Sequence, residues 1–202
     1  MSSMNAVDIC NLALYHCGHN KQINSLDENS SEARKCKRIY SNSRQLLLAS
    51  AKWGFAKVYT SLSQTGNTPP QGWGYEYHYP AGALRILEIP RSNVAITPIP
   101  FTDGTVYDAT HNKWSRVIWT NHENAGMLFL GDVTLESMFS IHFAQTLAAY
   151  MAFLLSKDIA QKSRITEQNW QLYQSMLSEA ERVSAAESVD EEQPDASWIR
   201  NR

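Results

Sequence analysis

Apolar residues recur at helical spacing along the first part of the chain and predict two helices. The apolar face of the first helix is made of Ala6, Cys10, Ala13, Leu14 and Cys17. Gly18 follows where a glycine in left-handed conformation commonly ends a helix. Asn29 is the predicted N-cap of the second helix, with Glu32 three positions later. The apolar face of this second helix is made of Ala33, Cys36, Tyr40 and Leu47. A pair of helices leaves part of each apolar face uncovered, so we expect further elements to cover these two.

The helical period stops at Trp53-Gly54-Phe55-Ala56, and short strand patterns with turn residues between them follow. They predict strands at Val58–Leu62, Tyr75–Tyr79, Leu84–Ile89, Val94–Ile99, Thr105–Tyr107, Trp114–Trp119 and Met127–Leu130. Tyr75, Tyr77 and Tyr79 alternate with polar residues, which favours a strand with one buried face. The middle of the chain is therefore predicted to be a small β module.

Helical patterns return at Leu135–Lys157 and Arg164–Ala186. The stretch Ser137–Ser156 contains no Asp, Glu, Lys or Arg and is long enough to raise the question of a membrane span, which takes about 20 residues. Polar residues such as His142 and Gln145 interrupt it, and no loop charge bias frames it. We therefore expect no membrane span. We expect instead a central helix that packs on several sides or against another subunit.

The composition is that of a soluble globular protein, with 43% hydrophobic and 19% charged residues among 202. Three cysteines on helical faces argue against a disulfide framework and for a reducing compartment. The first residues show no signal-peptide pattern, so we expect synthesis in the cytoplasm. The net charge of −2 is divided unevenly, with +4 in residues 1–57, −2 in 58–135 and −4 in 136–202. This asymmetry suggests contacts between copies of the chain, or separate roles for its two ends, and it argues against dedicated nucleic-acid binding.

The sequence contains few of the residue patterns that mark catalytic or metal-binding sites. It lacks a G-x-S-x-G elbow, H-E-x-x-H, a P-loop and a glycine-rich dinucleotide turn. The residues that could in principle gather around a metal are His111, His122, Glu123, Asp132 and His142, but their spacing fits no ligand pattern. We therefore expect neither a metal nor a cofactor, and no enzyme.

Two clusters could support binding. The basic residues Arg34, Lys35, Lys37 and Arg38 on the second helix could contact phosphates or a neighbouring subunit, or could simply form its solvated face. The aromatic segment Trp73–Tyr79 could stack on bases or sugars, although its alternation favours packing within a strand.

The last residues of the sequence combine an acidic, proline-interrupted stretch with two large apolar side chains. Asp190-Glu191-Glu192 and Pro194 are followed by Trp198, Ile199, Arg200 and Arg202. Such a segment buries no core of its own. Tryptophan beside arginine is the typical composition of an interaction anchor, and a frayed terminus is the alternative.

The order of these parts resembles the head-to-tail adaptor family of tailed phages, and most closely the tail tubular protein A family of short-tailed phages. The matching residues are Asn11-Leu12-Ala13-Leu14, Gly18, Ile23, Leu26, Ala33, Tyr40, Leu46-Leu47-Leu48, Trp53-Gly54-Phe55-Ala56 and, more loosely, Trp73–Pro80. The match covers residues 5–90, is one of architecture over 91–186, and does not extend into the tail as sequence. Each motif is short, and their order and spacing carry the resemblance.

The resemblance implies an α+β fold in which residues 1–56 and 135–186 form a four-helix bundle. A small antiparallel β module at 57–134 is inserted into it, and 187–202 form an extended C-terminal tail. It also implies a structural connector subunit in the neck of the virion. This subunit forms a ring that matches the twelve-fold portal, continues the DNA channel and carries the tail nozzle.

The partners implied are the portal protein, the nozzle protein, further copies of the chain, and double-stranded DNA that passes without specific binding. Trp198, Ile199, Arg200 and Arg202 are the expected portal contacts, and Arg34, Lys35, Lys37 and Arg38 the expected subunit contacts. The alternative function is a phage-borne enzyme such as a glycan hydrolase. It would use the aromatic segment around Trp73 and an acid such as Glu76 or Glu123.

Overall fold

The structure is a computed structural model that describes residues 4–90, 99–159 and 163–187. The helices are α1 (Ala6–His16), α2 (Ser31–Ser50), α3 (Ile141–Ile159) and α4 (Ser163–Glu187), with short 3-10 turns η1 (Gly54–Ala56) and η2 (Glu136–Met138). The strands are β1 (Lys57–Ser61), β2 (Tyr75–His78), β3 (Ala83–Glu88), β4 (Phe101–Asp108), β5 (Lys113–Thr120) and β6 (Gly126–Gly131). The described residues divide into two compact units: a helical unit, of residues up to Ala56 with Gly131–Glu187, and a β unit, Lys57–Leu130.

Local sequence signals explain how the first two helices begin and end. Asn5 and Asp8 form a capping box at the start of α1, and Gly18, with φ of +73°, lies just past its end. In the loop that follows, the Asn11 side chain donates to the Ile23 carbonyl and accepts from its amide, at 2.9 and 2.8 Å. The N-cap of α2 is Ser30 rather than the predicted Asn29, because its hydroxyl accepts from the amide of Ala33.

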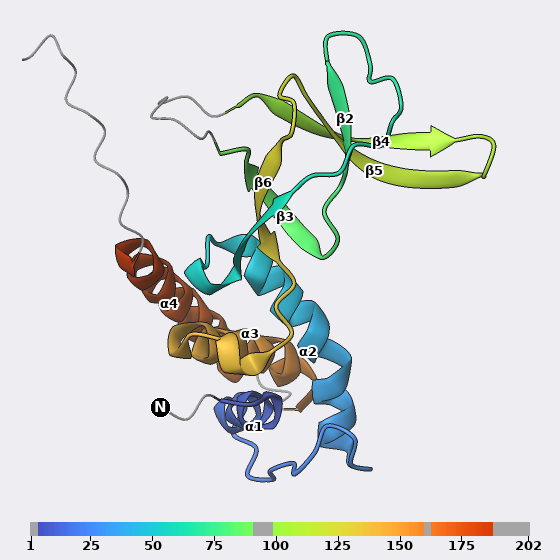
Figure 1. Cartoon of the computed structure of the whole chain (residues 1–202). Coiled ribbons are helices and arrows are strands. Elements are labelled where there is room, and N and C mark those ends of the chain that lie inside the picture. Colours follow the sequence, from blue (N-terminus) through green and yellow to red (C-terminus); the bar gives the residue numbers. More distant parts are fainter. Residues whose placement is uncertain (1–3, 91–98, 160–162, 188–202) are drawn as a thin grey trace, which may run out of the picture. The chain divides into compact units, whose positions relative to one another are not determined.

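The core of the helical unit is centred on α3. The main helix–helix contacts of this unit all involve α3, which packs against α1, α2 and α4 (Figure 1). Its buried residues are Phe143, Ala144, Thr146, Leu147, Ala148, Ala149, Met151, Ala152, Leu155 and Ser156, and they occupy most of its circumference. From Ile141 onward, the uncharged stretch 137–156 is thus a helix packed on several sides, as expected. No helix among the described residues is long and apolar enough to span a membrane.

The predicted four-helix bundle with a small inserted β module is wrong, although the structure is α+β. Because α3 is apolar on most sides, the other helices pack around it instead of sharing one core as four equivalent partners. The helix expected from Leu135 begins only at Ile141, after the short turn η2. In addition, the middle of the chain forms two separate three-stranded antiparallel sheets. The predicted tail, apart from Glu187, lies outside the described residues.

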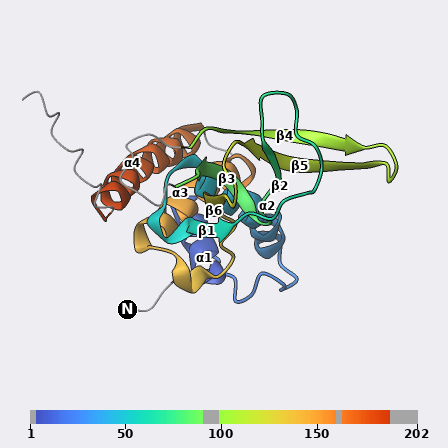
Figure 2. The ribbon, with the colours of Figure 1, turned by 45° about the horizontal axis from the view of Figure 1, so that its top comes forward.

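The two sheets of the β unit have the strand orders β1-β6-β3 and β2-β5-β4. The long β4–β5 hairpin is visible in Figure 2. Asp108 shapes its turn by accepting from the amides of Thr110 and His111, and Asn112 has a φ of 51°. The core of the unit consists of Tyr77, Ile89, Ile99, Ile118, Ala125, Met127 and Phe129. The strand predicted at Val94–Ile99 lies outside the described residues except for Ile99.

Candidate functional site

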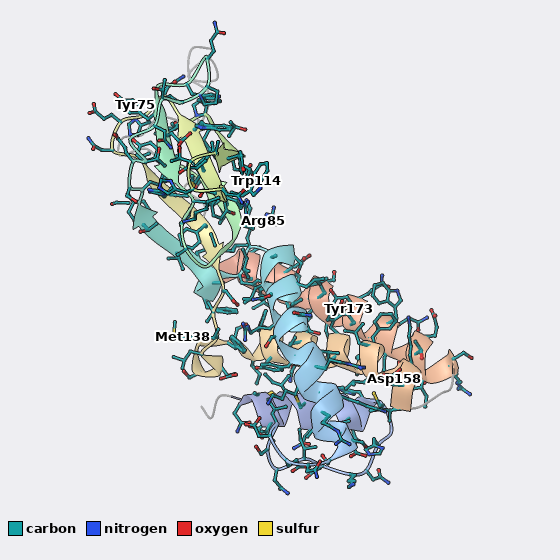
Figure 3. The ribbon with its side chains drawn as sticks, turned by 90° about the vertical axis from the view of Figure 1, so that its right-hand side faces the viewer. Tyr75, Arg85, Trp114, Met138, Asp158 and Tyr173 are labelled. Atoms are coloured by element: carbon teal, nitrogen blue, oxygen red, sulfur yellow. The ribbon has the colours of Figure 1, made fainter. Side chains whose placement is uncertain are left out.

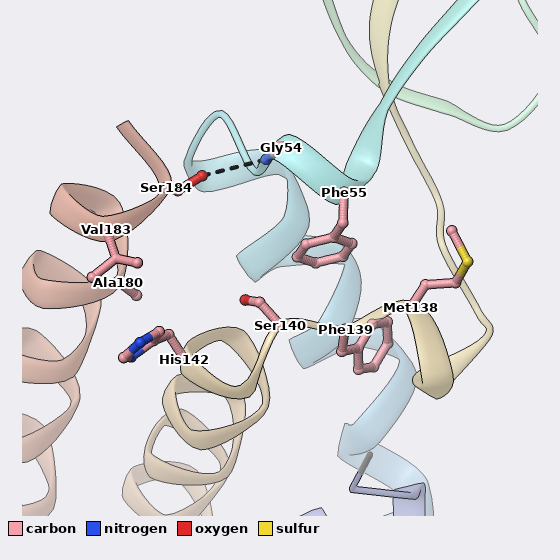
Figure 4. Close-up of a pocket in the computed structure, with 9 residues that line it drawn as sticks. All are labelled: Gly54, Phe55, Met138, Phe139, Ser140, His142, Ala180, Val183 and Ser184. Atoms are coloured by element: carbon pink, nitrogen blue, oxygen red, sulfur yellow. Dashed lines mark hydrogen bonds between the residues drawn. The ribbon is translucent and has the colours of Figure 1, made fainter. Parts of the chain in front are cut away.

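A pocket of about 120 Å³ opens on the helical unit where three segments distant in sequence meet (Figure 4). Gly54 and Phe55 come from η1, while Ala180, Val183 and Ser184 come from the last turns of α4. Its remaining lining residues are Met138, Phe139, Ser140 and His142, around the start of α3. The pocket therefore forms only when the Trp53–Ala56 segment, η2 and α4 come together.

An aromatic cluster supports one side of this pocket. The ring of Phe143 packs against those of Trp53, Phe55 and Phe139, with centroid distances of 5.0, 5.1 and 4.8 Å. The Trp53 indole N–H donates to the Leu47 carbonyl at 2.7 Å, which satisfies its polar atom inside the core. The segment Trp53–Ala56, where the helical period ends, thus contains a 3-10 turn, and the rings of Trp53 and Phe55 pack against the first turn of α3.

The serine hydroxyls of the pocket already have partners within the helical unit. Ser184 Oγ accepts from the Gly54 amide and donates to the Lys52 carbonyl, both at 3.3 Å. Ser140 Oγ accepts from the Phe143 amide at 3.2 Å, in the first turn of α3. Phe55, Phe139 and Val183 supply apolar wall and His142 adds a polar group, so the pocket suits a side chain that is mostly apolar with one polar atom.

Large apolar side chains are exposed around η2, beside the pocket. Leu135, Met138 and Ile141 are 60%, 52% and 61% exposed, and together we call them the apolar rim. Figure 3 labels Met138 among the side chains of this part of the chain. Clustered exposed apolar residues of this kind mark surfaces that become covered by a partner. Sequence reasoning did not find this rim because it placed residues 135–140 inside a long helix.

The predicted subunit-contact residues lie on α2, and each binds a group of the helical unit. Lys37 pairs with Asp27 at 2.6 Å, and Arg38 pairs with Asp158 at 3.4 Å. Lys35 donates to the Asp158 carbonyl, and Arg34 donates to the Asn29 side chain. The hydrogen bond from Lys37, with its charge, holds the pKa of Asp27 below its ordinary value. The cluster is therefore an exposed basic surface that neighbouring carboxylates partly neutralise.

The predicted portal contacts, Trp198, Ile199, Arg200 and Arg202, lie outside the described residues.

The acid proposed for the alternative enzyme, Glu76, lies in a structural hydrogen-bond network. It is 4% exposed and accepts from Thr65 Oγ1, Asn67 Nδ2 and Trp119 Nε1 at 2.7, 3.0 and 2.8 Å. Burial raises its pKa, but these three hydrogen bonds outweigh burial and leave the pKa lowered. A carboxylate with a lowered pKa and three donors is held ionised to fix its neighbours, which is the reverse of what a general acid requires. Glu123, the other proposed acid, is exposed on the loop before β6.

The scattered residues considered for a metal do not gather. Among residues 4–90, 99–159 and 163–187, no group of three His, Cys, Asp or Glu side chains could hold a metal ion. Asp132 instead accepts from Arg44 and Gln45, and the His111 ring binds Asp108 at 2.6 Å.

A second exposed apolar surface belongs to the β unit and was missed in the sequence. Tyr107 on β4 pairs in register with Trp114 on β5, and their ring centroids are 4.8 Å apart. They are 48% and 69% exposed, and we call them the hairpin aromatic pair; Figure 3 labels Trp114. The signal that could have found it is the pair of strands predicted at Thr105–Tyr107 and Trp114–Trp119, because their pairing as a hairpin places Tyr107 opposite Trp114.

Comparisons of this chain with protein-family models and with curated protein sequences find no match.

Proposed function

We propose that this chain is a structural subunit of a phage head-to-tail connector, which joins the portal to the tail nozzle and forms a ring around the DNA channel. The proposal begins from the order of the resembling residues, from Asn11-Leu12-Ala13-Leu14 to Trp53-Gly54-Phe55-Ala56. It places the chain in the neck of the virion, where its work is mechanical and needs no catalytic group.

The observation that supports this proposal best is that each compact unit carries its own exposed apolar surface. The helical unit has the apolar rim of Leu135, Met138 and Ile141, and the β unit has the hairpin aromatic pair. A connector subunit must contact several different proteins, so it needs separate surfaces that assembly covers. Exposed tryptophan and tyrosine are also the side chains that most often anchor interfaces.

The basic cluster on α2 supports a further, weaker contact with a neighbouring copy of the chain. Its cations keep exposed side chains even though Asp27 and Asp158 compensate them, with exposures of 63% for Lys37 and 71% for Arg38. An exposed, partly compensated surface steers and orients a neighbouring copy more than it adds affinity.

Mass measurement by size-exclusion chromatography with light scattering, with and without the portal protein of the same phage, tests the proposal. We expect the chain to join the portal as a ring, and we expect Leu135→Asp or Trp114→Ser to weaken that assembly by about tenfold. Leu46→Asp is the matched control, because Leu46 is 51% exposed and belongs to neither surface. A chain that never joins the portal, or three variants with equal effects, would overturn the proposal.

A further inference from the structure

We infer that the pocket between α4 and the start of α3 is a docking site for this chain's own residues beyond Glu187, with Trp198 as the side chain that enters it. The inference concerns a contact within one chain. It therefore does not depend on the proposed connector function.

The position of the pocket along α4 is the first support. Ala180, Val183 and Ser184 line it, and α4 ends only three residues after Ser184, at Glu187. The chain thus leaves the helix less than two turns from the pocket, since a helix rises about 1.5 Å per residue.

The covalent reach is more than sufficient. Trp198 is eleven residues beyond Glu187 (198 − 187), and a linker of this length spans at most about 36 Å when extended. The entropy cost of closing a loop grows only slowly with its length, so a linker of this length is compatible with the contact.

The chemistry of the pocket matches the large apolar residues of the segment. Phe55, Phe139 and Val183 supply apolar walls, and the two serine hydroxyls are already hydrogen-bonded. His142 adds a polar group to the wall, so the pocket suits a side chain that is apolar with one polar atom, as an indole is. In residues 188–202 the large apolar side chains are Val189, Trp198 and Ile199. An indole is the largest apolar group among them, and it gains most from burial against aromatic rings.

Charge adds a weaker argument. Asp190, Glu191 and Glu192 follow α4 in sequence, and Lys52 is an exposed cation beside the end of this helix. Lys52 lies there because its carbonyl accepts from Ser184 Oγ at 3.3 Å. A segment that folds back over Ser184 would bring its acidic residues near this lysine, which favours the proposed direction of the chain.

Photo-crosslinking in the full-length chain tests the inference. The crosslinking amino acid benzoylphenylalanine replaces Trp198, the protein is irradiated without any partner, and the joined peptides are identified by mass spectrometry. We expect products of monomer mass, at a yield independent of protein concentration. The linked peptides should contain Met138–Ser140 or Ala180–Ser184.

Two variants make the test specific. Val183→Asp places a carboxylate in the apolar wall, and we expect it to lower the crosslink yield by about tenfold. Ala186→Asp is the matched control on the same helix, because Ala186 is exposed and does not line the pocket. If Val183→Asp impairs folding, Met138→Asp replaces it, since Met138 lines the pocket and is 52% exposed.

Crosslinks that map elsewhere, or that Val183→Asp and Ala186→Asp reduce equally, would overturn the inference. Products found only at dimer mass would also overturn it and would assign the pocket to the same segment of a second copy. Because no portal protein is present, none of these outcomes bears on the connector proposal, whose test is ring formation on the portal.

Discussion

Arg44 Nη2 donates to Asp132 Oδ1 at 2.8 Å, and both side chains are largely shielded, with exposures of 8% and 22%. Gln45 donates to the other oxygen of Asp132 at 2.7 Å, and Tyr40 donates to Glu136 at 3.1 Å. These bonds attach two turns of α2 to the segment that follows β6. The packing of α3 thus begins from a segment fixed by buried polar contacts as well as by apolar ones.

Removing the carboxylate of this network should destabilise the helical unit. Asp132→Ala leaves the buried guanidinium of Arg44 without its partner, and we expect the free energy of unfolding in urea to fall by about 2–4 kcal/mol. Asp158→Ala is the control, because the Arg38–Asp158 pair is 3.4 Å long and exposed on both sides. The control should cost less than about 1 kcal/mol. Equal losses for the two variants would contradict the buried role of Asp132.

Gly104 on β4 lies under the ring of Trp119 on β5. A Cβ atom at position 104 would overlap the Cζ3 and Cη2 atoms of this indole, which is held in place by its hydrogen bond to Glu76. Gly104→Ala should therefore displace Trp119 and lower the free energy of unfolding by about 1–3 kcal/mol. The near-ultraviolet circular dichroism of the tryptophans should change with it.

Gly74→Ala is the matched control in the same unit. A Cβ atom there would meet the Asn121 side chain at 3.5 Å, which is ordinary van der Waals contact. We expect its stability and near-ultraviolet spectrum to stay close to those of the parent protein. If Gly104→Ala behaves like this control, Trp119 does not occupy the space above Gly104.

The stability of the β unit should depend on pH through Glu76. Its pKa in the folded protein lies below the ordinary 4.5, because hydrogen bonds from Trp119, Asn67 and Thr65 outweigh the effect of burial. The unfolded chain therefore takes up this proton at a higher pH than the folded chain. The contribution of Glu76 to the free energy of unfolding is thus fully present well above pH 4.5. It is lost as the pH falls through the pKa of Glu76 in the folded protein.

A pH series of thermal unfolding curves on Glu76→Gln measures this contribution. The side-chain amide of Gln directs its own N–H group toward the donors that bind Glu76. We therefore expect the substitution to lower the free energy of unfolding by about 1–3 kcal/mol at neutral pH. The difference from the parent protein should then shrink as the pH falls below about 4.5. Glu88→Gln changes an exposed carboxylate of the same unit and should leave the profile unchanged. A difference from the parent that stays constant with pH would contradict the ionised network.

The helical elements could be predicted from the sequence because their signals are local. The buried faces of α1 and α2 contain Cys10, Leu14, Cys36, Tyr40 and Leu47, as the helical spacing predicted. The spacing of apolar residues does not specify which helices pack together, because the apolar face of one helix can pack against that of any other. The prediction of a four-helix bundle was wrong for this reason. The uncharged stretch, most of which forms α3, was the sign in the sequence that one helix would be packed on several sides.

The β unit shows a second limit of predicting structure from the alternation of apolar and polar residues. The alternation from Tyr75 to Tyr79 predicted one buried face, and Tyr77 is indeed 1% exposed. Glu76, on the opposite face, is nevertheless buried, because Thr65, Asn67 and Trp119 supply donors from distant positions. The pocket was unpredictable for the same reason, since its walls come from η1, η2 and α4 and no single motif contains them.

The cysteines of the helical unit should be inert toward thiol reagents while the protein is folded. Cys10, Cys17 and Cys36 are all buried and free, and Cys17 Sγ donates to the Ala152 carbonyl at 3.3 Å. Burial raises the pKa of Cys17 to about 11, and a hydrogen bond to Cys36 together with burial raises that of Cys10. Near pH 8 these two groups are thiols, whereas the thiolate is the reactive form. The hydrogen bond with Cys10 lowers the pKa of Cys36, so the expected inertness of Cys36 rests on its burial.

Ellman's reagent measures this directly. At about pH 8 we expect no rapid reaction of the native protein and three equivalents after unfolding in urea, with a native rate that tracks the opening of the core. Tyr15→Cys is the positive control, because position 15 is 72% exposed on the same helix as Cys10. It should add one fast thiol without changing the slow ones. A rapid equivalent in the parent protein would contradict the burial of at least one of these three cysteines.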